Sequence, residues 1–427
     1  MAPGIGNLKK RAVITGLGVV APNGIGKDAF WEAVVEGRSG IDWVRSFDAS
    51  DLYCQVAGEV RDFDPTDYMD AHDVRRSGRF VHFAMAASRL AVEDAEIDLT
   101  RLDPFRVGAI VGSSVGASGN IADDVYATYY AKGPRACGAL DHVLLAPHTA
   151  TAYVTIAFGM KGPNASTATG CCASLEAIAS ARDILRSGQA DVMVVSGTEA
   201  CVSRFGMSLL CRTNVLTHRN EEPSKASRPY DATRDGLVLS EGAGALVVET
   251  AEHALGRGAH IYAEVCGFGS TTEGTHLVVP DASGIELASA FRAALLDSRL
   301  APEEIDYVCA HGIANRDYDI ADTRAIKQVL GPRAYNIPVS SIKSTTGQPF
   351  AAGGAWQAAV ACMSIQTNTV PPTTNYGTPD PQCDLDYVPN KARSVRVNAT
   401  MINSHSFGGT HAALILRAFD EHLGARN

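Results

Sequence analysis

Residues 162–200 read GPNASTATGCCASLEAIASARDILRSGQADVMVVSGTEA, and this stretch is the first candidate for the chemistry and indicates a helix followed by a strand. Small residues lead up to Cys171. The apolar residues after it recur at helical spacing: Leu175, Ile178, Ala181, Ile184 and Leu185. Gly188 predicts the end of this helix, and residues 191–197 predict a fully buried strand. We therefore expect a helix that begins at the cysteines and returns directly into a sheet.

The position of Cys171 suggests a nucleophile. A cysteine in the first turn of a helix lies beside unpaired backbone N–H groups and the positive end of the helix dipole, and both lower the pKa of a thiol. Such a thiolate would attack a thioester, and the same N–H groups would hold the oxyanion that forms. The alternative is that Cys171 and Cys172 are small buried apolar residues, as most cysteines are. This stretch alone leaves both interpretations open.

Composition limits the classes of protein. A chain of 427 residues with 46% hydrophobic residues can bury a large core and has room for two or three domain-sized units. Its 40 glycines, most of them next to apolar strands, indicate many tight strand-to-helix turns and hence an α/β fold. The net charge of −10 argues against a nucleic-acid binder.

The cysteines and the N-terminal segment indicate a cytoplasmic protein. The ten cysteines are dispersed and form no CxxC pair, which favours a reducing compartment over a disulfide framework or a zinc site. Residues 1–16 show no apolar core of an export signal. No uninterrupted apolar run reaches the roughly 18 residues that a membrane span needs.

Predicted strands and helices alternate along the chain. Strands are expected over residues 11–20, 106–113, 191–197, 245–249, 261–267 and 305–310. Helices are expected over residues 27–36, 73–90, 285–298 and 320–330, with a helix-like segment over 142–162. The element order after about residue 258 is similar to the order before it, which is consistent with a duplicated unit. We therefore divide the chain into residues 8–257 and 258–419.

One motif in the first predicted strand is similar to a nucleotide-binding motif. Gly16, Gly18 and Ala21 spell GxGxxA, as in dinucleotide-binding folds. In those folds a helix opens directly on the glycines, whereas here the turn 22–24 (PNG) intervenes. We therefore expect a structural strand and turn.

Four separated segments, in order, carry a family resemblance. They are TATGCCASLEAI (167–178), YVCAHG (307–312), SSIKSTTGQ (340–348) and FGGT (407–410). They resemble the β-ketoacyl synthases, which elongate chains on acyl carrier proteins, over nearly the whole chain. The resemblance implies the thiolase fold, in which duplicated αβαβα halves pack as a five-layer sandwich, usually in a dimer. It implies no metal and no organic cofactor.

The resemblance also implies roles for individual residues. Cys171 matches the nucleophile, His311 the first catalytic histidine, and Lys343 a lysine that organises the pocket electrostatically. Phe407 matches the residue whose backbone N–H, with that of Cys171, forms the oxyanion hole and whose ring gates the acyl pocket. His311 also follows a predicted strand directly, which is where α/β sites form, although a lone histidine is more often structural.

Several positions depart from the family pattern. The family usually reads KSxxGH where this chain reads KSTTGQ, so Gln348 stands in place of the histidine. Glutamine keeps N–H donors but cannot gain or lose a proton at any working pH. In the NSFGFGGT motif, His405 replaces a phenylalanine and Ser406 a glycine, so we expect a stiffer and more polar gate. The HGTxT pattern also becomes His311-Gly-Ile313-Ala-Asn315, so the contacts on the malonyl side are expected to differ.

Basic residues suggest a docking site for a carrier protein. Arg75, Arg76 and Arg79 crowd together near the start of the helix predicted over 73–90, and Arg212 is a further candidate. A basic cluster on an acidic chain is a plausible dock for an acidic carrier, and the resemblance implies the same contact. The alternative is a solvated basic face.

By resemblance, the reaction is a decarboxylative condensation. Cys171 takes an acyl group from a carrier thioester, and His311 and Gln348 donate hydrogen bonds to the carbonyl of an incoming malonyl thioester. Loss of CO2 gives an enolate that attacks the acyl-cysteine. The implied partners are an acyl carrier protein and a second subunit, either an identical chain or a chain-length factor.

Two other functions stay open. Segments 338–344 and 369–389 resemble the catalytic subunits of multi-protein polyketide synthases, whereas 15–24 and 343–354 resemble their partner, the chain-length factor. That partner normally lacks the cysteine, so Cys171 together with His311 favours a catalyst. A structural partner and an acyl-transfer or priming enzyme without condensation are the alternatives.

Overall fold

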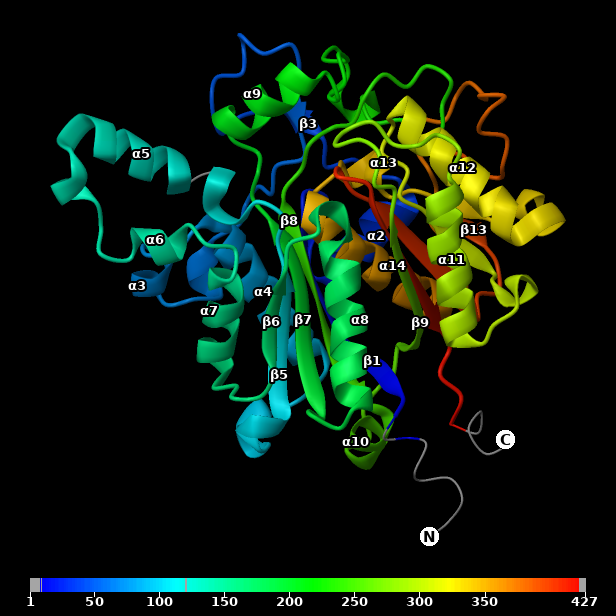
Figure 1. Cartoon of the computed structure of the whole chain (residues 1–427), viewed down its shortest axis with the longest axis horizontal. Coiled ribbons are helices and arrows are strands. Elements are labelled where there is room, and N and C mark those ends of the chain that lie inside the picture. The colour runs from blue at the N-terminus through cyan, green and yellow to red at the C-terminus, as the bar shows by residue number, and fades with distance from the viewer. Residues whose placement is uncertain (1–7, 9, 120, 422–427) are drawn as a thin grey trace.

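The computed structural model describes residues 8, 10–119 and 121–421, and one mixed sheet runs through it (Figure 1). Its first part contains, in spatial order, β1 (Ala12–Ala21), β8 (Gly242–Thr250), β7 (Val192–Glu199), β5 (Val107–Gly112) and β6 (Asn164–Thr167). Its second part contains β9 (Ala263–Thr272), β15 (Thr410–Arg417), β14 (Ala399–His405), β10 (Tyr307–Cys309) and β11 (Val339–Ser340).

The two parts of the sheet have the same strand order and directions. In the first part, β1/β8 and β8/β7 are antiparallel, and β7/β5 and β5/β6 are parallel. In the second part, β9/β15 and β15/β14 are antiparallel, and β14/β10 and β10/β11 are parallel. The parts join where Val13 and Ile14 of β1 pair with β9. We propose the division at 257/258 because it falls between α10 (Ala251–Gly256) and β9.

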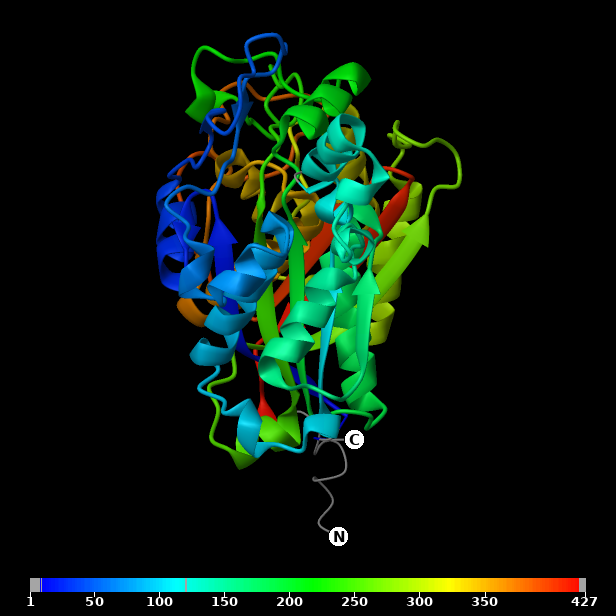
Figure 2. The same cartoon turned by 90° about the vertical axis from the view of Figure 1, so that its left-hand side faces the viewer.

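Helices cover the sheet in three layers. The central layer contains α8 (Ala173–Arg186) and α14 (Gly353–Thr367), which contact strands of both parts. α4 (Arg79–Asp94) and α7 (Thr149–Phe158) cover the first part, and α11 (Ile285–Ser298) and α12 (Arg316–Leu330) lie beyond the second, on the opposite flank (Figures 1 and 2). Nearly every residue of α14 is buried, as expected for a helix between two sheets. This is the five-layer thiolase arrangement that the resemblance implied.

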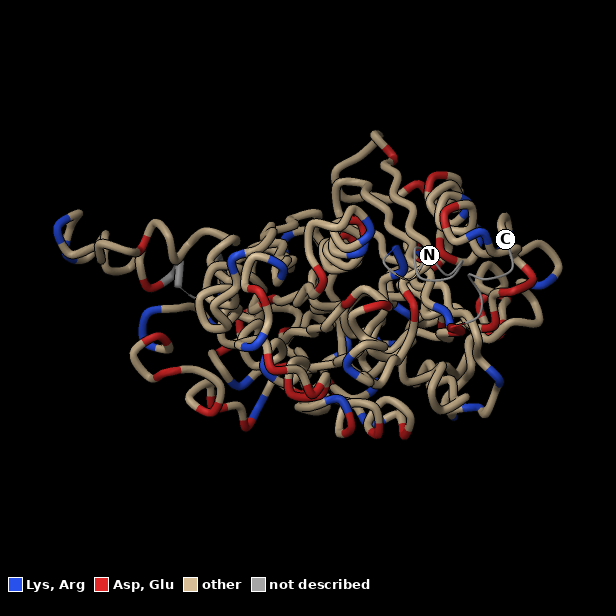
Figure 3. The backbone as a smooth tube through the Cα atoms, turned by 90° about the horizontal axis from the view of Figure 1, so that it is seen from below, with Lys and Arg blue, Asp and Glu red and all other residues tan. Residues whose placement is uncertain are grey.

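The remaining elements are short or lie at the surface. The other helices are α2 (Lys27–Glu36), α3 (Ala71–Val74), α5 (Ile121–Lys132), α6 (Asp141–Leu144), α9 (Arg204–Thr213) and α13 (Lys343–Thr346). The other strands are β2 (Gly24–Ile25), β3 (Asp42–Trp43), β4 (Val56–Ala57), β12 (Thr369–Val370) and β13 (Arg393–Ser394). α5 stands out from the body of the molecule, and charges of both signs are interspersed along the chain (Figures 1 and 3).

The glycines of the GxGxxA motif serve helix packing. A methyl group on Gly18 would lie 1.9 Å from the carbonyl oxygen of Ala87, and one on Gly16 would lie 2.1 Å from that of Ala91. Both carbonyls belong to α4, so the two glycines let this helix lie directly on β1.

Most predicted elements are present, with one clear correction. The helices predicted over 27–36 and 285–298 have these bounds in the structure. The helix predicted over 73–90 is wrong as one element, because α3 ends at Val74 and α4 begins at Arg79. Gly78, between them, is extended, and Ser77 donates a side-chain hydrogen bond to the carbonyl of Asp73 at 2.7 Å, which closes the turn.

Two global features complete the fold. No helix in the described part of the chain has the length and apolar character needed to cross a membrane. The ten cysteines, all within the described residues, are free thiols.

Candidate active site

Cys171 lies where β6 turns into α8. The residue occupies a 3-10 turn, Gly170–Cys172, and α8 begins at Ala173. Gly170 has φ +63, so the turn needs glycine at this position. Cys172 points instead into the main core, with its sulfur 3.3 Å from the carbonyl oxygens of Ser404 and Thr410. The two adjacent cysteines therefore have different surroundings.

A narrow cavity joins Cys171 to residues from the second half of the chain. Its polar lining consists of Cys171, His311, Gln348 and His405. Its other lining residues are Leu237, Ile313, Tyr318, Phe350 and Phe407. The sulfur and the imidazole of His311 thus share one pocket, as the proposed chemistry requires.

Gln348 makes direct contact with the sulfur. Its Nε2 donates to Sγ of Cys171 at 3.2 Å, while its Oε1 is buried without a hydrogen-bond partner among the described residues. The backbone of Gln348 is fixed on both sides, since its N–H donates to Val238 at 2.8 Å and its carbonyl accepts from Ser240 at 3.0 Å. The amide is therefore held with its donor side toward the nucleophile.

His311 lies directly after β10, as expected. Its Nδ1 is 3.4 Å from the hydroxyl of Ser404, and its buried Nε2 has no hydrogen-bond partner in the described structure. Burial, assisted by the nearby Lys343 and two histidines, His405 and His411, holds the pKa of His311 well below its usual value. The imidazole is therefore neutral at pH 7, and Nε2 is the nitrogen left for a ligand.

Lys343 supports the site from behind. Its buried ammonium donates to the carbonyl of His311 at 2.7 Å and to Oε1 of Gln357 at 3.4 Å. Burial lowers the pKa of Lys343 to about 8, with Cys309 and Cys171 acting in the opposite direction. It does not line the cavity, so its effect on the reacting atoms is electrostatic.

The pKa expected for Cys171 was wrong. Burial raises the pKa of the Cys171 thiol to about 12, although Lys343 acts to lower it. The sulfur is packed among apolar side chains, and Glu199 nearby also disfavours the thiolate. Desolvation therefore outweighs the favourable position before a helix.

The N–H group of Cys171 already has a partner. It donates to the hydroxyl of Ser406 at 3.2 Å, so one of the two donors expected for an oxyanion is engaged by a side chain. The ring of Phe407 packs edge-on against Tyr318 at 6.1 Å and Phe350 at 6.2 Å. Ser406 and Phe407 thus place both a hydroxyl and a ring at the nucleophile.

A second cavity adjoins the first at Cys171, Phe350 and Phe407. It has a volume of about 410 Å³, and Cys171, Phe350 and Phe407 line both cavities. Its further apolar lining includes Val115, Cys201, Phe205, Leu209 and Leu210. An acyl group attached to Cys171 would have a largely apolar space beside it.

His405 and Asp322 form the part of the site that the sequence did not assign. Nε2 of His405 lies 2.9 Å from Oδ1 of Asp322, and both side chains are fully buried. Asn403 donates to the same carboxylate at 2.7 Å. The histidine itself was visible in the sequence as a departure from the family motif, but no local pattern marks Asp322 on α12 as its partner.

The four predicted docking arginines differ in their surroundings. Arg75, Arg76 and Arg212 are exposed. Arg79 instead forms an ion pair with buried Glu241 at 2.7 Å, and its guanidinium lies 4.5 Å from the ring centre of Phe83. The charge of Arg79 is therefore largely compensated by Glu241 and contributes less to a docking surface.

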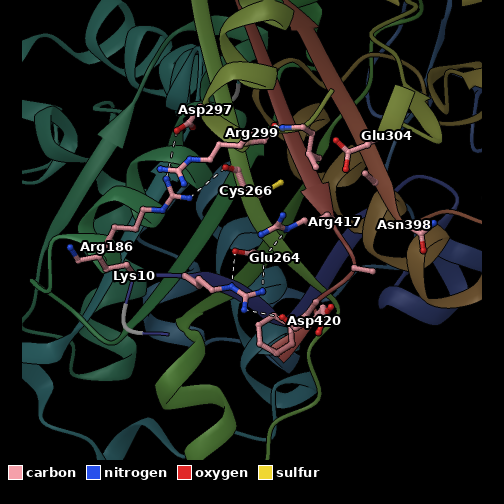
Figure 4. Close-up of a pocket in the computed structure, with 16 residues that line it drawn as sticks. Lys10, Arg186, Glu264, Cys266, Asp297, Arg299, Glu304, Asn398, Arg417 and Asp420 are labelled. Carbon is pink, nitrogen blue, oxygen red and sulfur yellow. Dashed lines mark hydrogen bonds and ion pairs between the residues drawn. The ribbon is translucent and has the colours of Figure 1, made fainter. Parts of the chain in front are cut away.

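A cleft of about 770 Å³ lies elsewhere (Figure 4). It is lined by Arg186, the last residue of α8, whereas Cys171 lies just before the first. The 14 residues of this helix separate the two by roughly 20 Å. Part of the cleft's charge is paired, since Glu264 lies 2.8 Å from Arg11 and 2.9 Å from Arg417. Among the described residues, no group of three or more His, Cys, Asp or Glu side chains could hold a metal.

Comparison with known proteins gives a consistent family. Residues 9–254 match the family model of the β-ketoacyl synthase N-terminal domain, and residues 262–377 match that of the C-terminal domain. The chain is 39% identical to 3-oxoacyl-[acyl-carrier-protein] synthase 2 of Synechocystis sp., over 96% of this chain and 99% of that relative.

Two solved structures superpose closely. One is AntDE:AntF, a type II polyketide synthase acyl carrier protein in complex with its ketosynthase, with a TM-score of 0.89 and 32% identity over 96% of this chain and 99% of the other. The second is the ishigamide ketosynthase/chain length factor, with a TM-score of 0.89 and 31% identity over the same shares. The chain therefore belongs to the β-ketoacyl synthase family, as a thiolase-fold condensing enzyme of the type II kind and an acyltransferase by class.

Proposed function

We propose that this protein elongates acyl chains on an acyl carrier protein, as the β-ketoacyl synthase of a type II polyketide or fatty acid synthase. The observation that carries the proposal is the contact of Gln348 Nε2 with Cys171 Sγ at 3.2 Å, in a cavity that His311 also lines. The cavity thus combines a nucleophile, an amide donor and a neutral imidazole. These groups are the ones that acyl transfer and enolate formation require.

In the first half-reaction, Cys171 takes the acyl group from a carrier thioester. The sulfur–acyl bond forms on Cys171, and the thiol proton leaves with the carrier's sulfur. Gln348 stabilises the negative charge on sulfur through its N–H, and Lys343 stabilises it electrostatically. The acyl chain would occupy the apolar cavity beside Phe407.

In the second half-reaction, a malonyl thioester enters the narrow cavity, whose volume of about 10 Å³ has to widen to receive it. Neutral His311 and the amide of Gln348 hold its carbonyl oxygen, and loss of CO2 leaves an enolate. The enolate carbon attacks the acyl carbonyl of Cys171, and the carbon–sulfur bond breaks. The hydroxyl of Ser406 must move off the Cys171 N–H before that N–H can hold the oxyanion.

The surface supports a dimer with a second chain of this family, identical or not. β6 is the edge strand of the sheet, and its residues 164–166 are exposed. The same side carries exposed Tyr130 on α5 (81%) and Ile156 on α7 (77%). An open strand edge beside exposed apolar side chains is a surface suited to a partner. The ishigamide structure contains a ketosynthase and a chain length factor. A chain length factor is therefore the first partner subunit to test.

We further propose that the carrier docks on Arg75, Arg76 and Arg212, in the cytoplasm. Reversing Arg75 and Arg76 to glutamate should raise KM for the carrier about tenfold and leave the melting temperature unchanged, since both are exposed. Arg79→Ala is the contrast. It should destabilise the fold by about 3 kcal/mol, because it leaves Glu241 buried and unpaired. If Arg79→Ala raised KM for the carrier as much as the Arg75/Arg76 variant and left the stability unchanged, Arg79 would belong to the docking site.

The experiment that tests the function separates three candidates. The protein, alone and with a candidate partner subunit, is incubated with acyl and malonyl carrier proteins, and acyl-enzyme mass and CO2 release are measured. A condensing enzyme gives both signals. A priming acyltransferase gives the acyl-enzyme without CO2. A structural partner, the alternative suggested by Gln348, gives neither by itself and supports product formation by the other subunit.

A further inference from the structure

Condensation needs a proton that Gln348 does not carry. Acyl-Cys171, the malonyl carboxylate and one proton give the β-ketoacyl thioester, CO2 and the Cys171 thiol. An amide does not ionise, and His311 is neutral in its buried position. Lys343 is charged, but its ammonium is bound to His311 O and Gln357 and does not line the cavity. Another group in the cavity has to hold this proton.

His405, the last residue of β14, meets the geometric requirements. It lines the same cavity as Cys171 and is fully buried. Its Nε2 faces the carboxylate of Asp322 at 2.9 Å, whereas its Nδ1 is buried and has no hydrogen-bond partner in the described part of the chain. One nitrogen is therefore anchored and the other remains available to a substrate or to the sulfur.

The carboxylate behind His405 stays ionised. Burial disfavours the charge of Asp322, but His405 and Asn403, together with the N–H of Gly312 at 2.8 Å, hold the pKa of Asp322 below its usual value. The hydroxyl of Tyr230 donates to the same carboxylate at 3.0 Å. An ionised carboxylate against Nε2 orients the ring of His405 and leaves Nδ1 as its free nitrogen.

The other neighbours of His405 supply no competing negative charge at contact. The ring of His311 is stacked on it at 5.4 Å, Tyr318 meets it at 5.6 Å, and His411 meets it edge-on at 4.7 Å. Burial, followed by the proximity of His405, lowers the pKa of His411 to about 3, so His411 is neutral. Glu273 lies beyond His411, 3.1 Å from its Nε2.

We propose that His405, held by Asp322, is the proton-carrying imidazole of this active site and takes the place of the one that Gln348 does not provide. As the enolate forms the carbon–carbon bond, the carbon–sulfur bond breaks and its electron pair goes to Cys171. The Nδ1 proton of His405 then passes to that sulfur, and solvent reprotonates His405 between turnovers. This inference rests on the condensing function proposed above.

Two variants test it. His405→Phe keeps an aromatic ring of similar size but removes both nitrogens, and should lower CO2 release and condensation about 100-fold. Acylation of Cys171 should stay within about threefold of the wild type, because the proton needed there leaves with the carrier thiol. The double variant His405→Phe/Gln348→His returns an imidazole to the cavity and should recover most of the lost rate. Melting temperatures and intact-mass acylation show that both proteins are folded.

A third variant gives an independent readout if His405→Phe does not fold. Asp322→Asn keeps an oxygen acceptor for His405 but removes the negative charge beside its Nε2. The rate of condensation should then fall about tenfold, with Cys171 acylation retained.

The outcomes are distinct. Wild-type condensation that survives His405→Phe, or a loss that Gln348→His does not rescue in an acylation-competent protein, overturns the inference. A wild-type rate of condensation in Asp322→Asn does the same. If the wild type releases no CO2 with any partner subunit, the proposed condensing function is refuted independently of the His405 variants.

Discussion

The two sides of the active-site cavity come from different halves of the chain and follow the family pattern to different degrees. On one side, Cys171 keeps the expected turn before a buried helix. On the other, Gln348 replaces the usual histidine, and His405 replaces a phenylalanine. If the roles proposed above hold, the nucleophile is retained and the second imidazole of the site has moved from position 348 to position 405.

The largest expected effect concerns the nucleophile side. Cys171→Ala should abolish acylation by an acyl carrier thioester, because no other sulfur lines the narrow cavity among the described residues. Cys172→Ala is the matched control and should keep acylation, since that sulfur lies in the core with backbone carbonyls as neighbours. Intact mass spectrometry after incubation measures both. An acylated Cys171→Ala protein would show that Cys171 is not the nucleophile.

Gln348 tests the other side. Gln348→Ala removes the donor that lies 3.2 Å from the sulfur and should lower condensation about 100-fold. Gln348→Glu keeps the length of the side chain but replaces the N–H group with a negative charge, and should lose at least as much. Decarboxylation of malonyl carrier measures the loss. Activity near the wild-type level in both variants would show that the amide has no role on the histidine side.

The pH dependence of Cys171 reactivity separates the effect of the helix terminus from the effect of burial. Because burial raises the pKa of Cys171 to about 12, the thiolate fraction rises with pH throughout the range below it. Alkylation of Cys171 by iodoacetamide should therefore accelerate about tenfold per pH unit between about pH 7 and 10. Peptide mapping assigns the modification to this cysteine. A plateau near neutral pH would mean that the helix terminus prevails over burial.

The smallest effect is expected at Ser406. Ser406→Gly frees the N–H of Cys171 from a 3.2 Å hydrogen bond, and acylation should become several-fold faster, in line with about 1 kcal/mol for one hydrogen bond. Ser406→Ala removes the hydroxyl but keeps the restricted backbone. If only the glycine variant is faster, loop freedom rather than the hydroxyl controls the oxyanion site. Stopped-flow acylation rates decide between them.

Much of the fold followed from local pattern. Periodicity and turn residues predicted the helices 27–36 and 285–298 with their bounds, because caps and apolar spacing act within a few residues. The break between α3 and α4 was missed, since a helical pattern continues through Ser77 and Gly78. Arg79 pairs there with Glu241, far along the chain, and such a partner leaves no local signal.

The sequence by itself determined the family, the order of the elements and the identity of Cys171, His311 and Gln348 as the residues to examine, because these depend on motifs and short-range spacing. Only the tertiary structure decided the protonation of the site. Burial reversed the expected pKa of Cys171, and the fold brings Asp322 of α12 within 2.9 Å of His405 at the end of β14. Desolvation and contacts between distant segments arise when the chain is folded, so they have no counterpart in the linear order of residues.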